Sequence, residues 1–284
     1  DRAGAAGQQR LRVRHMSGQD HIAAGIGWRE HQGDGPVLVA LHGIGSEARA
    51  FDPLAALLPG WRVLAWEAPG YGPSEPLATD WPRAADYAEA LARFLDARGL
   101  NRVHLLGHSL GTLIGAAFAR SCPERVLTLT LASCAQGGGA AAGALPPAQQ
   151  ARLDDLARLG GAEFARTRAP RLVFQPEKSR ALVARVAEGM AKVKLPGYAQ
   201  AVRMLATGDL AADCAVLSVP TAVIVGAEDI VTPPAQSERV HAALPAAAKG
   251  FFTLIPGTGH ALHQQAPEAL AQALEAHVQQ GVTP

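Results

Sequence analysis

Short, continuous apolar runs recur along the chain, and each is bounded by glycine, proline or polar residues. The runs are Val37–Leu41, Trp61–Trp66, Val103–Leu106, Val126–Ala132, Thr221–Val225 and Phe251–Ile255. Runs that are continuous rather than alternating indicate strands covered on both faces, as in a parallel sheet. Residues 19–31 predict one or two further strands at an antiparallel edge.

Helical patterns separate these runs. They cover Ala50–Leu58, Arg83–Arg98, Thr112–Arg120, Pro234–Leu244 and Pro267–Gln279. An alternation of strands and helices is typical of an α/β fold with a doubly wound, mostly parallel sheet.

Residues 135–214 interrupt this alternation. The segment begins with the glycine-rich stretch 136–140 and continues with Pro146 and Pro147, which start a helix-rich region. We expect helices at about 148–159, 161–168, 177–190 and 197–206, with a short strand at Leu172–Phe174. The pattern predicts a helical unit of 135–214 inserted into a core formed by 1–134 and 215–284.

Composition excludes several classes of function. The chain has 284 residues, 48% hydrophobic and 18% charged, with a net charge of +1. A nearly neutral chain argues against nucleic acid as the main partner. No apolar run approaches the roughly 20 residues of a membrane span. The basic residues Arg10, Arg12 and Arg14 lie in a loose arm, 1–18, which we interpret as a solvated tail.

Cysteine usage bears on the compartment. The three cysteines, Cys122, Cys134 and Cys214, are sparse and form no C-x-x-C motif. They indicate free thiols in a reducing environment rather than a disulfide scaffold. The first 25 residues contain no apolar run of the kind that secretory signals carry. We therefore expect a cytoplasmic protein; the sequence leaves its oligomeric state open.

The strongest chemical signal is Gly107-His108-Ser109-Leu110-Gly111. This G-x-S-x-G pattern follows a predicted buried strand and precedes a predicted helix, which is the context of a nucleophile elbow. The tight turn exposes the Ser109 hydroxyl at the edge of the sheet. The two outer glycines avoid collisions with neighbouring backbone.

A second glycine-rich turn, His42-Gly43-Ile44-Gly45, follows the first buried strand. A serine nucleophile requires backbone N–H donors for the developing oxyanion. We assign the N–H groups of Ile44 and Leu110 to this oxyanion hole. His42 is predicted to brace the loop.

An acid and a base follow two later strands. Glu228 and Asp229 both lie after Thr221–Val225, and spacing alone does not separate them. His260 follows the last strand in a glycine-containing loop and is our candidate base, with His263 as competitor. The two histidines lack the acidic third ligand of a metal site, so no metal is expected.

Together these motifs resemble the α/β-hydrolase fold superfamily, over residues 33–284. The resemblance rests on the two glycine turns, on the 226–233 loop and on Gly259-His260, in the family's chain order of Ser, Asp and His. It implies Asp229 as the triad acid and 135–214 as a helical cap. Glu67 and Gln265 depart from the family, in which Asp and Glu are usual at these positions.

The resemblance implies a serine hydrolase that cleaves a small-molecule carboxylic ester through an acyl-enzyme, without a cofactor. Serine at position 109 argues against dehalogenases and epoxide hydrolases of the family, which use Asp there. A C–C bond hydrolase or an enol-lactonase of aromatic-compound breakdown remains an alternative. A non-catalytic small-ligand binding protein on the same fold remains a further one.

The predicted cap contains the candidates for substrate contact. The bulky ones are Phe164, Phe174, Met190, Tyr198 and Met204, each of which also suits the interior of the cap. Arg166, Arg168 and Arg171 are candidates for binding a substrate carboxylate, although solvated helix faces explain them as well.

Overall fold

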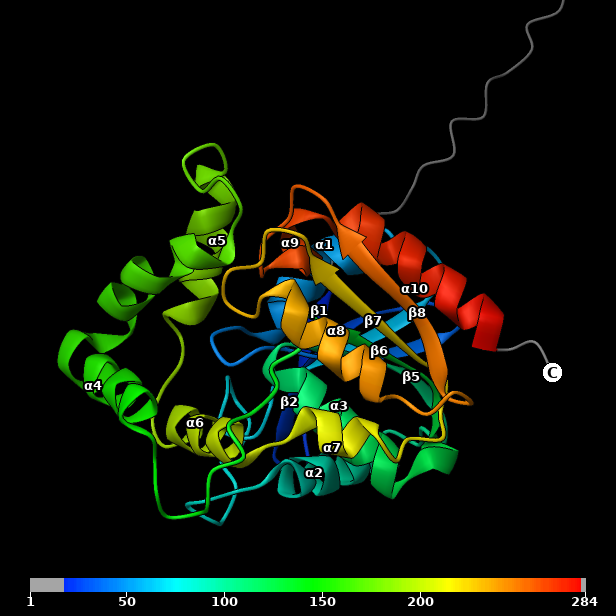
Figure 1. Ribbon diagram of the computed structural model, residues 1–284, viewed down its shortest axis with the longest axis horizontal. Coiled ribbons are helices and arrows are strands. Elements are labelled where there is room, and N and C mark those ends of the chain that lie inside the picture. Colours follow the sequence, from blue (N-terminus) through cyan, green and yellow to red (C-terminus); the bar gives the residue numbers. More distant parts are fainter. Residues whose placement is uncertain (1–17, 282–284) are drawn as a thin grey trace, which may run out of the picture.

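A computed structural model describes residues 18–281, so the predicted tail, with Arg10, Arg12 and Arg14, lies almost wholly outside the described residues. The strands are β1 Gln19–Ala23, β2 Ile26–His31, β3 Val37–Leu41, β4 Arg62–Trp66, β5 Val103–His108, β6 Val126–Ala132, β7 Thr221–Gly226 and β8 Lys249–Ile255. They form one eight-stranded sheet in the order β1-β2-β4-β3-β5-β6-β7-β8. The predicted α/β class is confirmed (Figure 1).

The sheet is parallel from β4 to β8, and its first two strands are antiparallel. Every apolar run of the sequence became a strand, and residues 19–31 supply the expected antiparallel edge. The arrowheads of β7 and β8 in Figure 1 point toward α4 and α5, so the strands end on the side of the inserted helices. In parallel sheets ligands bind at these carboxyl ends.

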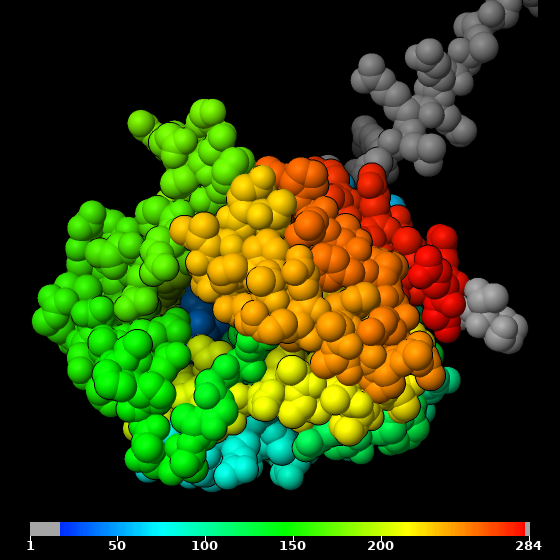
Figure 2. All heavy atoms as spheres, in the orientation of Figure 1, coloured from blue at the N-terminus to red at the C-terminus, as the bar shows by residue number. Residues whose placement is uncertain are grey.

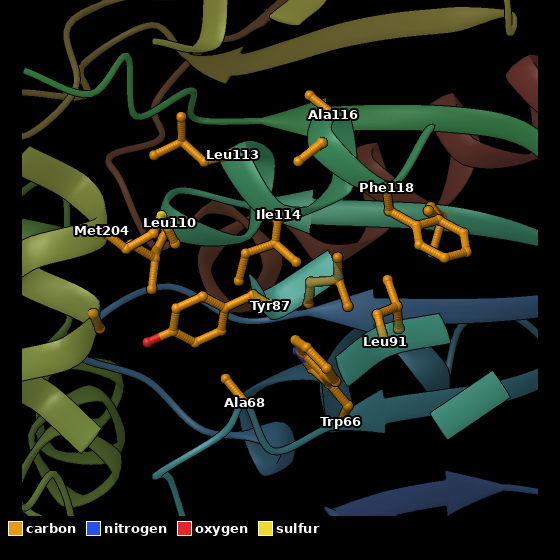
Figure 3. Close-up of a cluster of buried hydrophobic side chains, with 14 of the residues drawn as sticks. Trp66, Ala68, Tyr87, Leu91, Leu110, Leu113, Ile114, Ala116, Phe118 and Met204 are labelled. Carbon is orange, nitrogen blue, oxygen red and sulfur yellow. The ribbon is translucent and has the colours of Figure 1, made fainter. Parts of the chain in front are cut away.

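Helices cover both faces of the sheet. They are α1 Asp52–Ala55, α2 Ala84–Ala97, α3 Leu110–Ser121, α8 Pro234–Ala243, α9 Leu262–Gln265 and α10 Pro267–Gly281. Val39 and Leu41 of β3 pack on the face of α2, α3 and α8, whereas Leu38 and Ala40 pack on the face of α1 and α10. Because side chains alternate along a strand, a strand buried on both faces is apolar throughout. Figure 3 shows part of the α2–α3 face.

The chain between β6 and β7 is helical. It contains α4 Pro147–Arg168, the 3₁₀ helix η3 Ala169–Leu172, α5 Arg180–Met190, α6 Gly197–Thr207 and α7 Leu210–Cys214. Gly160 has φ 71° and ψ 165°, so α4 is two helices joined at a kink. The expected strand at Leu172–Phe174 is wrong, because η3 ends there and Val173 pairs with no strand.

The inserted helices contact the core in different ways. Helix α7 packs against α3 and α8 of the core layer, whereas α4 packs mainly on α5 and α6. A side chain at Gly70 would collide with the backbone of Gly197 at the start of α6. The Gln200 side chain accepts a hydrogen bond from the Leu77 N–H and donates to the carbonyls of Leu77 and Thr79. These contacts hold α6 against the loop that follows β4.

One further difference from the sequence prediction concerns the length of an element. The predicted helix Ala50–Leu58 is instead a 3₁₀ turn, η1 Ala48–Phe51, followed by the four-residue α1.

Within residues 18–281, no helix is long and apolar enough to cross a membrane. Cys122, Cys134 and Cys214 are free thiols.

Candidate active site

The candidate nucleophile Ser109 lies in the tight turn between β5 and α3. Its backbone has φ 52° and ψ −115°, on the left-handed side that L-residues rarely adopt. The Ser109 N–H donates to the Ala132 carbonyl at 2.9 Å, and its own carbonyl accepts from the Thr112 hydroxyl at 2.6 Å. These bonds hold the strained turn in place, as expected where backbone strain belongs to a functional site.

The glycines on either side of this turn are sterically required. A side chain at Gly107 would collide with the Gly111 carbonyl, and one at Gly111 would collide with the Leu41 carbonyl. The strand, turn and helix therefore approach one another more closely than alanine permits. This close approach brings the first turn of α3 against the end of β3.

Asp229 and His260 are in direct contact. The His260 Nδ1 lies 2.8 Å from Asp229 Oδ2, and both side chains are buried. The Asp229 Oδ1 accepts the N–H groups of Val231 and Thr232, each at 2.9 Å. Asp229 therefore fixes the imidazole with Nδ1 toward itself, which leaves Nε2 for another partner.

The charge on Asp229 is stabilised. Burial raises the pKa of this carboxyl. The hydrogen bond from His260, the positive charge of His260 and the two hydrogen bonds from Thr232 lower the pKa by more, so that it lies below its ordinary value. The Thr232 hydroxyl lies 2.9 Å from Asp229 Oδ2 and 3.1 Å from His260 Nδ1. Asp229 is thus an anion at neutral pH, able to stabilise an imidazolium.

The geometry also separates the competing acid and base. The Glu228 carboxylate accepts the Thr258 N–H at 2.9 Å, which links the loop after β7 to the loop after β8. His263 is buried between Phe51 and His108, and neither of its ring nitrogens has a partner in the described part of the chain. Burial lowers the pKa of His263 well below its ordinary value, so it stays neutral. Neither residue contacts Asp229 as His260 does.

His108, next to the candidate nucleophile, braces the His260 loop. Its Nε2 donates to the His260 carbonyl at 2.7 Å. Burial lowers the pKa of His108 to about 3, so its ring is neutral and has one N–H to donate. His108 is buried and has a structural role in the described part of the chain.

The loop after β3 is held by the loop after β4. The His42 Nδ1 donates to the Gly43 carbonyl at 2.8 Å, and its Nε2 accepts the Ala68 N–H at 3.1 Å. The Tyr71 hydroxyl donates to the Ile44 carbonyl at 2.7 Å. Burial lowers the pKa of His42 to about 4, so these bonds persist at neutral pH.

Glu67, at a position where the family usually has Asp, is a nearly buried carboxyl. Its Oε1 accepts the Ala48 N–H at 3.2 Å, and Oε2 lies 3.6 Å from His42 Nε2. Burial raises the pKa of Glu67 to about 7. A carboxyl that titrates near neutrality therefore lies beside the loop of His42.

A cavity of about 540 Å³ opens above these residues. Its floor includes Ser109, His260 and the turn 43–46, and its walls come from α4, α5, α6 and the loop after β7. Figure 2 shows a hollow between the green helical segment and the yellow-to-orange C-terminal part, with blue N-terminal atoms at its bottom. The volume suits a small-molecule ligand.

The predicted substrate contacts divide into two groups. Phe164, Met190 and Tyr198 line the cavity, whereas Phe174 and Met204 do not. Met204 is buried beside Leu110 in the hydrophobic core (Figure 3). The Phe174 backbone is bound by the side chain of Gln265, which also accepts the Gly259 N–H.

The predicted arginine anchors divide in the same way. Arg168 and Arg171 line the cavity, whereas Arg166 points to solvent and pairs with Glu163 at 2.6 Å.

Within residues 18–281, no group of three or more His, Cys, Asp or Glu is arranged to hold a metal ion.

Two residues that the sequence did not single out are part of this site. Thr232 touches both Asp229 and His260, and its place three residues after Asp229 in a turn was an available signal. Arg152 lines the cavity from the first half of α4, and nothing in the local pattern distinguishes it from a solvated helix residue.

Comparisons with known proteins identify a family for this chain. Residues 38–273 match the Alpha/beta hydrolase family. The chain is 28% identical over 248 residues to the (E)-2-((N-methylformamido)methylene)succinate hydrolase of Acinetobacter baylyi, covering 86% of this chain and 91% of that protein. It is 38% identical over 108 residues to the 2-hydroxy-6-oxononadienedioate/2-hydroxy-6-oxononatrienedioate hydrolase 1 of Dechloromonas aromatica, covering 36% of this chain and only 37% of that protein.

The fold is similar to that of a thermophilic esterase from Thermogutta terrifontis. The TM-score is 0.79 at 24% sequence identity, over 91% of this chain and 95% of that chain. The match to the family model spans both glycine turns, the Asp229 loop and His260. On these grounds the chain belongs to the Alpha/beta hydrolase family.

Proposed function

We propose that the protein is a serine hydrolase that cleaves a small-molecule carboxylic ester through an acyl-enzyme. One observation carries this proposal: Ser109, on a strained turn, and His260, paired with Asp229, line the same 540 Å³ cavity. A nucleophile and an oriented base that face one ligand site are the components of acyl transfer.

The proposed reaction uses the free side of the imidazole. The Ser109 Oγ bonds to the acyl carbon while His260 Nε2 takes its proton, and the imidazolium is stabilised by Asp229. When the tetrahedral intermediate collapses, the bond to the alcohol oxygen breaks and His260 returns the proton to that oxygen. Water then attacks the acyl-enzyme by the same route and releases the acid.

The proposed oxyanion hole consists of the backbone N–H groups of Ile44 and Leu110. Among the described residues, neither N–H donates to a protein acceptor, so both are available to a ligand. The Leu110 N–H also begins α3, where the helix dipole favours negative charge. Tyr71 and His42 fix the loop that carries Ile44.

We propose the same division into domains as the sequence suggests, a core of 1–134 and 215–284 and a cap of 135–214. Support comes from α4, α5 and α6, which supply one wall of the cavity. The contacts of α7 with α3 and α8 place the end of this segment against the core layer.

A second candidate is hydrolysis of an enol lactone or of a C–C bond. The likeness to the Dechloromonas aromatica hydrolase favours it, although that alignment covers 36% of this chain. The same nucleophile and base would serve, so substrates rather than active-site variants separate the two candidates.

The experiment combines a serine-directed fluorophosphonate probe with a panel of esters, an enol lactone and a vinylogous diketone. We expect labelling at Ser109, and we expect Ser109→Ala to lower kcat on the best ester by at least about 10³-fold without loss of fold. Labelling elsewhere, or a Ser109→Ala variant with more than a tenth of wild-type activity, contradicts the nucleophile.

The acid is tested with a matched pair of neighbouring variants. Asp229→Asn removes the charge beside His260 and is expected to lower kcat by about 10³- to 10⁴-fold. Glu228→Gln keeps the acceptor for the Thr258 N–H and is expected to stay within about threefold of wild type. The reverse ranking of the two variants would move the acid to Glu228.

A further inference from the structure

The wall of the cavity opposite the core is strongly basic. Arg152 and Arg168 come from the two halves of α4, and Arg171 follows in η3. The kink at Gly160 turns the second half of α4 relative to the first, so both halves reach the cavity. No Asp or Glu of the described residues lines it. The positive charges therefore lack a neutralising carboxylate within the cavity.

Arg152 has few polar partners in the described part of the chain. Its Nε is buried without a hydrogen-bond partner among the described residues, and its Nη1 lies 3.4 Å from Gln149 Oε1. No carboxylate of residues 18–281 forms an ion pair with Arg152 or Arg171. Arg168 shares Asp155 with Arg158, at 3.3 Å and 2.9 Å. An unpaired, partly desolvated guanidinium is costly unless a ligand supplies the acceptor.

Aromatic rings hold two of these guanidinium groups in place. The guanidinium carbon of Arg168 lies 4.6 Å from the Phe164 ring centre, and that of Arg152 lies 6.0 Å from the Tyr198 ring centre. The two rings contact each other edge to face at 5.6 Å. Positioned guanidinium groups lose less entropy on binding an oxyanion than free ones do.

We propose that this hydrolase acts on esters that carry a carboxylate, and that Arg152, with Arg168 and Arg171, binds that carboxylate. This inference rests on the proposed function and adds the substrate class. A flat guanidinium matches the two oxygens of a carboxylate, and the amides of Gln136, Gln149 and Gln236 line the same cavity as further donors.

The test uses two matched pairs of esters. Para-acetoxybenzoate against para-acetoxybenzamide places the carboxylate in the leaving group, and phenyl hydrogen adipate against phenyl hexanoate places it in the acyl group. In at least one pair we expect the anionic ester to have a kcat/KM at least about tenfold higher. In Arg152→Gln this preference is expected to fall below about twofold, mainly through a higher KM for the anionic ester.

Arg166→Gln is the matched control. Arg166 lies on the same helix, is 72% exposed in its side chain and does not line the cavity, so the preference should persist. Arg152→Lys keeps the charge and is expected to retain part of the preference. In the Ser109→Ala background, the anionic ester of the pair that shows the preference should raise the Tm more than its neutral partner does, and Arg152→Gln should abolish the difference.

The outcomes separate this inference from the proposed function. If wild type cleaves the neutral esters as well as the anionic ones through Ser109, the carboxylate inference is wrong and the serine hydrolase stands. An anionic preference that survives in Arg152→Gln and in the triple variant with Arg168→Gln and Arg171→Gln also overturns it. If no ester is cleaved and Ser109 takes no fluorophosphonate, the proposed function itself fails.

Discussion

Ser109 shows how one residue can hold backbone strain that serves the site. Its φ of 52° is unfavourable for any residue with a side chain, yet the turn exposes the hydroxyl above the end of the sheet. The bonds to Ala132 and Thr112 stabilise a conformation that the isolated tripeptide would avoid. The strain should therefore be measurable in the free energy of unfolding.

The prediction at this scale compares Ser109→Gly with Ser109→Ala. Both variants lose the hydroxyl, but glycine adopts a positive φ without a steric penalty. We expect Ser109→Gly to be more stable than Ser109→Ala by about 1 kcal/mol, after the entropy that glycine loses on folding. Urea unfolding of the two inactive proteins measures this difference. Equal stability, or a less stable glycine variant, would show that the turn is not strained.

At the scale of elements, the junction of β3, β5 and α3 depends on how closely their backbones approach. Gly111, in the first turn of α3, lies against the Leu41 carbonyl at the end of β3. Gly115, one turn later, faces only the side chains of Leu129 and Leu41. The first contact is with rigid backbone and the second with flexible side chains.

Gly111→Ala is therefore expected to lower the free energy of unfolding by more than about 2 kcal/mol. Gly115→Ala is the control on the same helix, because its new methyl group would lie 3.2 Å from a Leu129 methyl carbon that can shift. It should change stability by less than about 1 kcal/mol, since alanine also favours the helix. Chemical denaturation ranks the two, and a tolerated Gly111→Ala would refute the close approach.

At the scale of the whole molecule, the buried carboxyl of Glu67 couples stability to pH. Its pKa rises from 4.5 in the unfolded chain to about 7 in the folded protein, because burial disfavours the charged form. Below 4.5 the carboxyl is protonated in both states and contributes nothing. Between 4.5 and 7 the unfolded chain loses its proton first, so stability falls as pH rises, and the full penalty is present above 7.

Glu67→Gln removes this titration and keeps an oxygen to accept the Ala48 N–H. We expect the variant to resemble wild type at pH 4 and to be more stable at pH 8 by up to about 3 kcal/mol. Urea unfolding of both proteins across this range gives the difference directly, because titrations common to both cancel. A constant difference across the range would place the pKa of Glu67 near its ordinary value.

Much of the fold follows from local pattern. The continuous apolar runs of β3 to β7 are legible because each of these strands is buried on both faces, and the helices between them have periodic apolar positions. The run of β8 forms the half-exposed edge strand of the sheet. The two wrong predictions, of a helix at Ala50–Leu58 and of a strand at Leu172–Phe174, fall where the pattern of apolar residues is too short to specify an element. The region of α1 is too short to be periodic. Leu172–Phe174 looks like a strand because it is apolar, but it follows a 3₁₀ helix and its backbone bonds the His260 loop at Leu172 rather than another strand.

The sequence by itself determined the α/β class, the elbow of Ser109 and the candidate pairs for acid and base, since each depends on residues adjacent in the chain. Only the tertiary structure showed that Asp229 rather than Glu228 contacts His260, and that His263 has no such contact. Only it brought Arg152 and Arg168 to the cavity of Ser109. These contacts depend on the positions of the loops after β7 and β8 and of the two halves of α4. Packing between segments that are distant in the sequence determines those positions. Local periodicity contains no information about such distances.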